Sequence, residues 1–263
     1  MIGSIHSAAQ PVEDGSQRPY SSLSGTRLWN SGYLSREEKQ ALEDTVSPAK
    51  ATAPNVELLR EGERAETLLI LTDGWACRYT MTRDGRRQIP TLLLPGDVGN
   101  LDSLLFDRLD YGVRTISHVM IAALPRDRAV ALAARYPGIA RAFTWLGLIE
   151  NAALSKKALS LGRRSASERL AHLLCELSVR LDAERDGKSS FAFPMTQEQL
   201  ADALGLTSVH VNRMVKHLRA EGLIETARGE MTIRDVAALR LLGGFSPRYL
   251  HMAVAAPALS TLS

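Results

Sequence analysis

The sequence predicts an α+β fold that begins with an antiparallel β-barrel, continues with one long helix and ends with short helices and a small hairpin. Three observations predict it. Between Val56 and Leu124, short apolar runs alternate with glycine-containing turns, which is typical of antiparallel strands in a sandwich or small barrel. After Pro125, apolar residues recur at three- and four-residue steps, which indicates helices. From residue 196 onward, two short amphipathic segments flank one glycine and precede a hairpin pattern.

Composition narrows the class of protein. The chain has 263 residues, of which 45% are hydrophobic, so it can pack one large domain or two ordinary ones. Its apolar runs are far shorter than the roughly 20 residues of a membrane span, and no apolar signal core follows the N-terminus. We therefore expect a cytoplasmic protein without a membrane partner. Cys77 and Cys175 lie far apart, which predicts two reduced thiols and no metal site.

The first 135 residues divide into a leader and a barrel. Residues 1–25 are rich in Ser, Gly, Gln and Pro without periodicity, which predicts a disordered leader. Ser35 and Glu38 form a capping-box pattern that predicts a short helix to about Asp44. We assign residues 26–135 to a sensor barrel, with strands at Leu68–Leu71, Ile89–Leu94 and Val119–Leu124 and turns at Asp73-Gly74, Asp84-Gly85 and Pro95-Gly96-Asp97.

Residues 136–162 are predicted to form one long helix. Pro137 suits the first turn of a helix, and about 25 residues at 1.5 Å each span nearly 40 Å. Glu150 is the only charge between Arg141 and Lys156, so the helix needs a large partner surface. A second copy of the helix is the simplest partner, giving a parallel dimer seam; the alternative is packing on its own barrel. The expected apolar stripe is Ile139, Phe143, Leu146, Ile149, Ala153 and Leu154.

Residues 163–245 are assigned to a C-terminal domain, and residues 246–263 to a tail. Gly162 is expected to end the long helix. The segment Ser165-Ala166-Ser167-Glu168 is a second capping box and opens another helix, and Asp186-Gly187-Lys188 predicts a turn before an extended piece at Phe191–Phe193. The apolar stripe of this helix is Leu170, Leu173, Leu174, Leu177 and Leu181.

The stretch from Thr196 to Arg219 predicts a helix-turn-helix. Thr196 and Gln199 form a third capping box, and Gly205 suits a left-handed turn between two helices. Thr207 then caps the second helix, residues 207–220. On its inner side lie Val211, Val215 and Leu218, which share one face at these spacings.

The outer face of the second helix is polar and basic. Asn212 and Arg213 carry the side chains that make bidentate contacts to adenine and guanine edges. A net charge of +3 for the whole chain does not by itself predict nucleic-acid binding, so this local placement carries the prediction. The layout is that of a helix that enters the major groove, and the alternative is a solvated basic hairpin. The candidate DNA-binding residues are Thr196, Thr207, Ser208, Val209, His210, Asn212, Arg213, Lys216 and Arg219.

A hairpin pattern follows the second helix. Two extended segments, residues 223–226 and 231–233, flank Ala227-Arg228-Gly229-Glu230, which predicts the wing of a winged helix-turn-helix. Arg228 near its tip is a candidate for a phosphate contact. A final helix is predicted from Asp235 to Leu242, closed by Gly243-Gly244.

This order of parts resembles the Crp/Fnr family of transcription regulators. The resemblance covers roughly residues 35–245 and is most specific in the helix-turn-helix. It implies a jelly-roll barrel that senses a signal, a long helix pair that transmits it, and a homodimer on a two-fold symmetric operator, with RNA polymerase as a further partner. It rests on Leu94-Pro95-Gly96-Asp97, Arg163-Arg164-Ser165-Ala166-Ser167-Glu168-Arg169-Leu170-Ala171 and the segment Thr196–Arg219.

The recognition helix departs from the family pattern at one position. The typical family helix has a Glu at its second position and an Arg four residues later. Here Val209 replaces the Glu, whereas Arg213 retains the Arg. A Glu accepts from cytosine amino groups, but Val meets only apolar surface such as a thymine methyl, so we expect a different half-site. His210 aligns with a phosphate-contacting position, with a helix-capping role as the alternative.

The barrel departs from the cyclic-nucleotide-binding members, which carry Gly-Glu and then Arg-Ser or Arg-Thr. Here Asp97 can replace the Glu, but the cassette Arg position falls on Leu109. Arg114-Thr115 imitates the dipeptide but lies too late by that count. A buried phosphate without a cation costs several kcal/mol, so a cyclic nucleotide is not supported as cofactor. The alternative is a cyclic-nucleotide-responsive regulator with a pocket of Gly96, Asp97, Arg114 and Thr115.

Other cofactors and functions have less support. The N-terminal cysteines of the oxygen-sensing branch are absent, and a lone His118 without a second-shell partner does not support haem. No nucleophile–base set, metal-ligand spacing or phosphate-binding loop indicates an enzyme. The sequence therefore predicts a sequence-specific, dimeric DNA-binding regulator, switched by a barrel ligand or constitutively active. A cyclic-nucleotide module acting on another protein is the remaining alternative.

Overall fold

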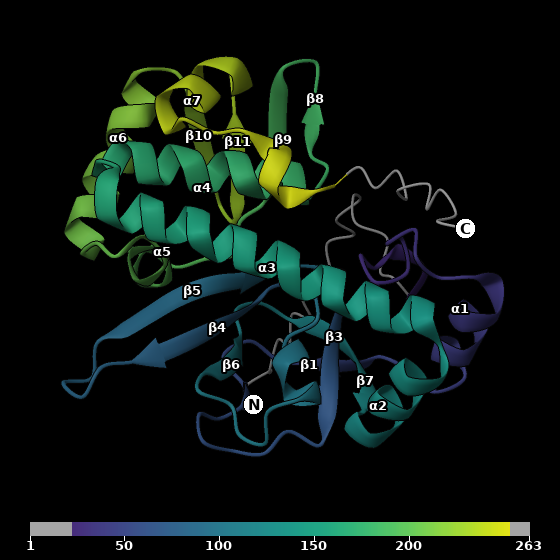
Figure 1. Ribbon diagram of the computed structural model, residues 1–263. Helices are drawn as coiled ribbons and strands as arrows, with labels where there is room; N and C mark the ends of the chain where they lie inside the picture. The colour runs from purple at the N-terminus through teal and green to yellow at the C-terminus, as the bar shows by residue number, and fades with distance from the viewer. Residues whose placement is uncertain (1–22, 253–263) are drawn as a thin grey trace, which may run out of the picture.

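The computed structural model describes residues 23–252 and has three parts. A β-rich N-terminal domain and a mixed C-terminal domain lie on opposite sides of one long helix, α3 (Pro137–Arg163), as Figure 1 shows. The helix begins with Pro137 in its first turn, as the sequence predicts. None of the helices in the described part of the chain combines the length and apolarity that crossing a bilayer requires.

The N-terminal domain consists of two antiparallel sheets that pack face to face. One sheet has the order β1-β7-β3 and the other β2-β6-β4-β5. Leu71 of one sheet and Val113 of the other lie in the apolar layer between them, as expected for inward-facing residues of a sandwich or jelly roll. The predicted apolar runs became three of the seven strands. The strands are β1 (Lys50–Thr52), β2 (Glu57–Leu59), β3 (Thr67–Asp73), β4 (Ala76–Met81), β5 (Arg87–Leu93), β6 (Gly112–Thr115) and β7 (Val119–Pro125).

Helices close one end of this domain. The capping box predicted at Ser35 is present and starts α1 (Arg36–Glu43). Its Glu38 carboxylate also accepts the Gly138 backbone N–H at 2.7 Å, which joins α1 to the first turn of α3. The helix α2 (Arg126–Arg135) follows β7, and the short 3₁₀ helix η2 (Leu101–Leu104) follows β5.

The segment before α1 is part of the fold, and the leader therefore ends earlier than residue 25. A 3₁₀ turn, η1 (Leu23–Gly25), buries Leu23, and Leu28 is fully buried in the same cluster as Ile139 and Phe143 of α3. These two leucines hold the segment on the domain. The polar composition of the segment gave no sign of this packing. The rest of the predicted leader, residues 1–22, lies outside the described residues.

The long helix packs mainly on its own chain with the face that was predicted to form the dimer seam. Ile139, Phe143 and Ile149 are buried within the chain. The prediction that this face meets a second copy of the helix is therefore wrong for these three residues. A different face is exposed and carries Leu148 and Leu159, at 64% and 45% exposure. Leu154, a member of the predicted stripe, is 38% exposed and lines a cavity on the inner side of the helix. The helix also continues through Gly162 and ends at Arg163, since one glycine costs a helix only about 1 kcal/mol.

The C-terminal domain contains the predicted helices and hairpin in the predicted order. Its strands form one antiparallel sheet of order β10-β11-β9-β8. The capping boxes at Ser165 and Thr196 are both present. The elements are α4 (Ala166–Arg180), β8 (Glu184–Arg185), β9 (Lys188–Ala192), α5 (Gln197–Leu204), α6 (Ser208–Ala220), β10 (Ile224–Ala227), β11 (Glu230–Ile233), α7 (Val236–Gly243) and η3 (Pro247–Leu250).

The C-terminal domain extends beyond residue 245, where the sequence placed the start of a tail. Tyr249 and Leu250 of η3 are buried, and the Tyr249 hydroxyl donates to the Glu176 carboxylate of α4 at 2.7 Å. The tail boundary therefore lies at least five residues later than predicted. Residues 253–263 lie outside the described part of the chain.

The two domains share one apolar cluster. Trp75 and Cys77 of the barrel lie in the same cluster as Leu200 and Leu204 of α5, and the rings of Trp75 and Phe193 meet edge to face at 5.9 Å between centroids. Around this cluster, Arg87 of β5 donates to Asp202 of α5 at 2.7 Å. The C-terminal domain is thus docked on the outer face of the β2-β6-β4-β5 sheet.

Candidate nucleic-acid interface

The turn between α5 and α6 is built around Gly205. This residue has φ +63° and ends α5 in the left-handed conformation, which favours glycine because a side chain is strained there. A Cβ atom at this position would also lie 2.9 Å from the Leu161 side chain of α3. The Thr207 hydroxyl then accepts the His210 N–H and caps α6. The sharp turn predicted from the sequence is therefore present, and it sets the angle between the two helices.

The inner face of α6 holds the helix on its domain. Val211 and Leu218 are fully buried, and Met214 and Val215 are partly buried against the same cluster. The predicted inward positions are therefore confirmed, with Val215 nearer the edge than the other two. Because the apolar face is anchored, the opposite face is fixed in orientation toward solvent.

The outer face of α6 presents the predicted polar and basic side chains to solvent. Arg213, Lys216 and Arg219 are exposed, and none of the three has a salt bridge or hydrogen bond within residues 23–252. Val209 is 79% exposed near the start of the helix. Thr196, Thr207, Ser208 and His210 are exposed as well, so nine of the ten candidate DNA-binding residues, all but the partly buried Asn212, are accessible to a partner.

A hollow on this face brings together side chains from both helices. Ser208, Val209, Asn212, Arg213 and Lys216 line it, together with Gln197 from the first turn of α5. The Asn212 side-chain amide donates to the Gln197 carbonyl at 3.1 Å. Gln197 was not among the residues predicted from the sequence. Its position directly after the Thr196 cap, in a helix crossing the start of α6, is the signal that could have identified it.

The predicted wing is a two-residue hairpin. Ala227 pairs with Glu230 at its end, and Gly229 in the turn has φ +73°. Arg228 is exposed at the tip. At the base, Arg234 and Glu225 form an ion pair, which holds the pKa of the Glu225 carboxyl below its usual value. The wing adds one cation near the polar face of the domain.

Arg114 and Asp97, the two charged residues of the predicted barrel pocket, bind different partners. Arg114 lies on the face of β6 opposite the buried Val113; it pairs with Glu57 at 3.8 Å and stacks over the Tyr79 ring. Asp97 instead binds Arg180 of α4 at 2.5 Å. The structure does not bring Arg114 and Asp97 into one site, because a side chain that alternates to the outer face of a strand cannot reach the loop beyond the sheet end.

Gly96 and Thr115, the other two predicted pocket residues, have structural partners. Gly96 has φ +97°, and a Cβ atom there would lie 3.2 Å from the backbone nitrogen of Arg27, so the N-terminal segment covers it. Thr115 is fully buried; its hydroxyl donates to the Ala53 carbonyl at 2.8 Å and accepts the Val56 N–H at 2.8 Å. Both residues brace loops of the barrel and face no open pocket.

A buried polar network joins the barrel to α3 and was not predicted from the sequence. Arg78 of β4 donates to the Gly99 carbonyl at 2.7 Å, pairs with Glu150 of α3, and stacks on the Tyr111 ring at 4.6 Å. Desolvation raises the pKa of Glu150, and the positive charge of Arg78 acts in the opposite direction. Arg78 gave no sequence signal because its partners are distant along the chain. It fills the space between the barrel and the middle of α3.

His118, the histidine considered as a haem ligand from the sequence, lies on the surface of the N-terminal domain. His118 is exposed at a turn, and no group of three His, Cys, Asp or Glu side chains within residues 23–252 is placed to hold a metal ion. Both cysteines are buried, and burial raises the pKa of Cys77 to about 11. These thiols are therefore protonated at neutral pH.

Comparison with protein families assigns both domains. Residues 50–136 match the model of the cyclic nucleotide-binding domain, and residues 168–242 match that of the Crp-like helix-turn-helix domain. The first range contains the barrel strands, and the second covers nearly all of the segment from α4 to α7.

Two curated relatives and one solved structure match most of the chain. An anaerobic regulatory protein of Pasteurella multocida is 24% identical over 221 residues, covering 84% of this chain and 81% of that protein. The nitrogen fixation regulation protein FixK of Azorhizobium caulinodans is 27% identical over 213 residues, covering 77% and 85%. The solved structure of FixK2 from Bradyrhizobium japonicum superposes with a TM-score of 0.68 at 26% identity, covering 76% of this chain and all of that one.

Proposed function

Because the chain belongs to the Crp/Fnr family of transcription regulators, we propose that it binds a two-fold symmetric DNA operator as a homodimer, with α6 of each subunit in a major groove. The observation that carries this proposal is the cationic face of α6. Arg213, Lys216 and Arg219 are exposed and have no ion-pair partner among the described residues. A fixed helix with free cations on one side is suited to phosphates and base edges.

The contacts divide by chemistry. Arg213 and Asn212 are suited to base edges, and Gln197 beside Asn212 extends this set because an amide can bind adenine in the same bidentate way. Lys216, Arg219 and Arg228 supply phosphate contacts, which position the domain and make affinity depend on salt. The protein would act without enzymatic chemistry, in the cytoplasm, with RNA polymerase as its further partner.

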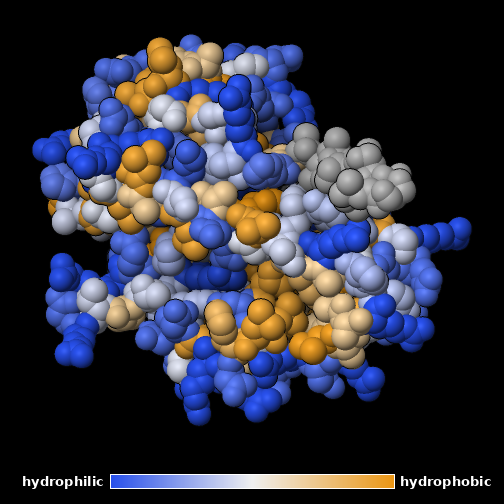
Figure 2. All heavy atoms as spheres, viewed as in Figure 1, coloured by the Kyte–Doolittle hydropathy of each residue, from blue (hydrophilic) through white to orange (hydrophobic). Residues whose placement is uncertain are grey.

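The exposed face of α3 supports the homodimer. Leu148 and Leu159 are exposed there, and this stripe also contains Asn151 and Ser155 and no charged residue between Arg141 and Lys156. Figure 2 shows apolar side chains on the visible surface over the middle of α3. A second copy of α3 would cover them and place the two reading helices about 34 Å apart, one turn of DNA.

An unbiased selection of DNA tests this function. The full chain would be incubated with a random duplex pool, and the bound fraction sequenced over several rounds. We expect enrichment of an inverted repeat whose half-site centres lie about 10 bp apart. A selected sequence without two-fold symmetry, or the absence of any enrichment, would contradict the proposal.

A further inference from the structure

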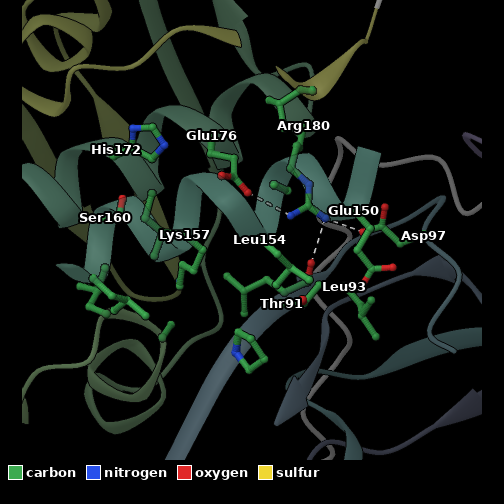
Figure 3. Close-up of a pocket in the computed structure, with 18 of the residues that line it drawn as sticks. Thr91, Leu93, Asp97, Glu150, Leu154, Lys157, Ser160, His172, Glu176 and Arg180 are labelled. Atoms are coloured by element: carbon green, nitrogen blue, oxygen red, sulfur yellow. Dashed lines mark hydrogen bonds and ion pairs between the residues drawn. The ribbon is translucent and has the colours of Figure 1, made fainter. Parts of the chain in front are cut away.

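A cavity of about 100 Å³ lies where the barrel, the long helix and the C-terminal domain meet. Strand β5 forms one wall, α3 a second and α4 a third, as Figure 3 shows. The loop that carries Asp97 closes one end, and Leu204 of α5 lies at the other. An occupant would therefore touch both domains and the helix between them.

Most charged groups around this cavity are paired. Arg180 binds Asp97 at 2.5 Å and Glu176 at 3.4 Å, and donates to the Leu92 carbonyl at 2.9 Å. Arg169 donates to three backbone carbonyls. Glu150 is paired with Arg78. The carboxylates of the cavity wall thus already have cationic partners.

Lys157 is the exception. It lies on α3 and lines the cavity (Figure 3), and none of the residues from 23 to 252 accepts a hydrogen bond from its ammonium or pairs with it. Desolvation lowers the pKa of Lys157 to about 8, with the charge of Glu176 acting in the opposite direction. A partly buried ammonium without a partner is unfavourable, and an anion in the cavity would supply the missing partner.

Most of the remaining wall is apolar and limits the size of an occupant. Leu92 of β5, Leu154 and Leu161 of α3, and Leu173 of α4 are among the apolar residues that line it. A dry apolar cavity of about 150 Å³ is known to hold benzene. The present cavity is smaller, at about 100 Å³, so it suits a short aliphatic chain rather than a ring. An occupant needs one anionic group and a small apolar body.

We propose that this junction cavity binds a small amphipathic monocarboxylate, with its carboxylate on Lys157 and its apolar part between β5 and α4. This inference rests on the proposed function, since it assigns the regulator an effector site outside the barrel interior. A ligand that contacts both domains favours the domain arrangement in which those contacts exist. Its binding is therefore coupled to the placement of α6.

Binding of probe molecules to the full chain tests this site. Butanoate and hexanoate would be titrated by ligand-observed NMR and calorimetry, beside butanamide and hexanamide, which match them in shape but carry no charge. We expect dissociation constants of about 0.1–1 mM for the carboxylates, a range suited to their few heavy atoms. The amides are expected to bind at least about tenfold more weakly, because they lack the charge-assisted contact.

A pair of variants locates the site. Lys157→Met should weaken carboxylate binding about tenfold or more, whereas Lys156→Met, at the exposed neighbouring position of the same helix, should leave it unchanged. Equal binding of acid and amide, unchanged binding by Lys157→Met, or no carboxylate binding up to about 10 mM would each overturn the inference.

The same preparations would be tested for DNA binding by gel shift on the selected operator. A protein that binds DNA but no carboxylate contradicts the cavity alone. A protein that binds carboxylates but no DNA contradicts the regulatory function alone. The acid–amide comparison uses the unmodified chain, so it remains valid even if a variant does not fold.

Discussion

At the scale of single residues, Val209 is the position at which the recognition helix departs from the typical family sequence. Its side chain is 79% exposed at the start of α6 and lines the hollow beside Arg213. An apolar side chain there can contact a thymine methyl but cannot accept a hydrogen bond from cytosine. Under the proposed function, Val209 would contribute specificity through the base pair that it tolerates.

Exchanging Val209 for the family's usual residue should change the operator. Val209→Glu introduces an acceptor for the cytosine amino group, so we expect the selected half-site to gain a C·G pair at one position, with a preference of about 1–3 kcal/mol. The DNA selection repeated with the variant measures this. An identical half-site from both proteins would mean that Val209 does not face a base.

Lys157 makes a second residue-scale prediction, on stability. Its pKa is lowered from 10.5 to about 8, so between these pH values the unfolded chain binds more protons than the folded one. The stability of the natural protein should therefore rise with pH across this window. Below about pH 8 the full cost of the buried ammonium is present, and Lys157→Met should raise the free energy of unfolding by up to about 3 kcal/mol.

Urea unfolding of both proteins at about pH 7 and about pH 10 checks this linkage. The gain from Lys157→Met should shrink at the higher pH, and Lys156→Met should show no such gain because its side chain is exposed. A gain that is the same at both pH values would show that Lys157 is not held in a desolvated site.

At the scale of elements, α3 has two faces with different partners. Ile139, Phe143 and Ile149 bury one face on the chain itself, whereas Leu148 and Leu159 expose the other. The sequence pattern identified the helix and its need for an apolar partner but not which stripe meets which partner. Periodicity locates apolar positions along a helix, whereas the choice between an internal and an external partner depends on tertiary packing.

A charge on the exposed face should separate the subunits. Leu148→Glu places two like charges near each other in a dimer and removes apolar contact, so we expect a monomer in analytical ultracentrifugation. Operator affinity should fall by about 100-fold or more, since each half-site is then bound independently. Thr144→Glu, one turn before Leu148 at the end of the stripe, serves as a control that should weaken the dimer less. A dimer that persists in Leu148→Glu would move the subunit interface elsewhere.

The short elements of the C-terminal domain were predictable because their signals are local. The capping boxes at Ser165 and Thr196 and the left-handed Gly205 each depend on residues within four positions of one another, as does the capping box at Ser35 in the N-terminal domain. The strands β4 and β6 lacked such signals. Arg78 and Tyr79 in β4 and Arg114 in β6 interrupt the apolar pattern because they serve contacts made only in the folded chain.

At the scale of the whole molecule, the two domains are held together by an apolar cluster with ion pairs around it. Arg180 of α4 reaches Asp97, and Arg87 of β5 reaches Asp202. These pairs join segments distant along the chain, so no sequence pattern could reveal them. They also explain why Asp97, predicted as a ligand residue of the barrel, is a domain contact instead.

Loosening one of these contacts should increase the mobility of the interface. Asp202→Ala removes the acceptor of the 2.7 Å bond from Arg87, so we expect faster amide hydrogen exchange in β5 and α5, with α6 unchanged. Glu198→Ala is the matched control, because Glu198 is 79% exposed and 3.7 Å from Arg87. Unchanged exchange in both elements would show that the docking depends on the apolar cluster alone.

The central claim is that α6 reads DNA through its exposed polar face, and Arg213→Ala tests it most directly. The measurement is the ratio of dissociation constants for the selected operator and a scrambled duplex, at one salt concentration, for the natural protein and the variant. We predict that the ratio falls toward one in the variant, by about 1–3 kcal/mol per half-site, while weak general binding remains through Lys216, Arg219 and Arg228. An unchanged ratio would contradict the account.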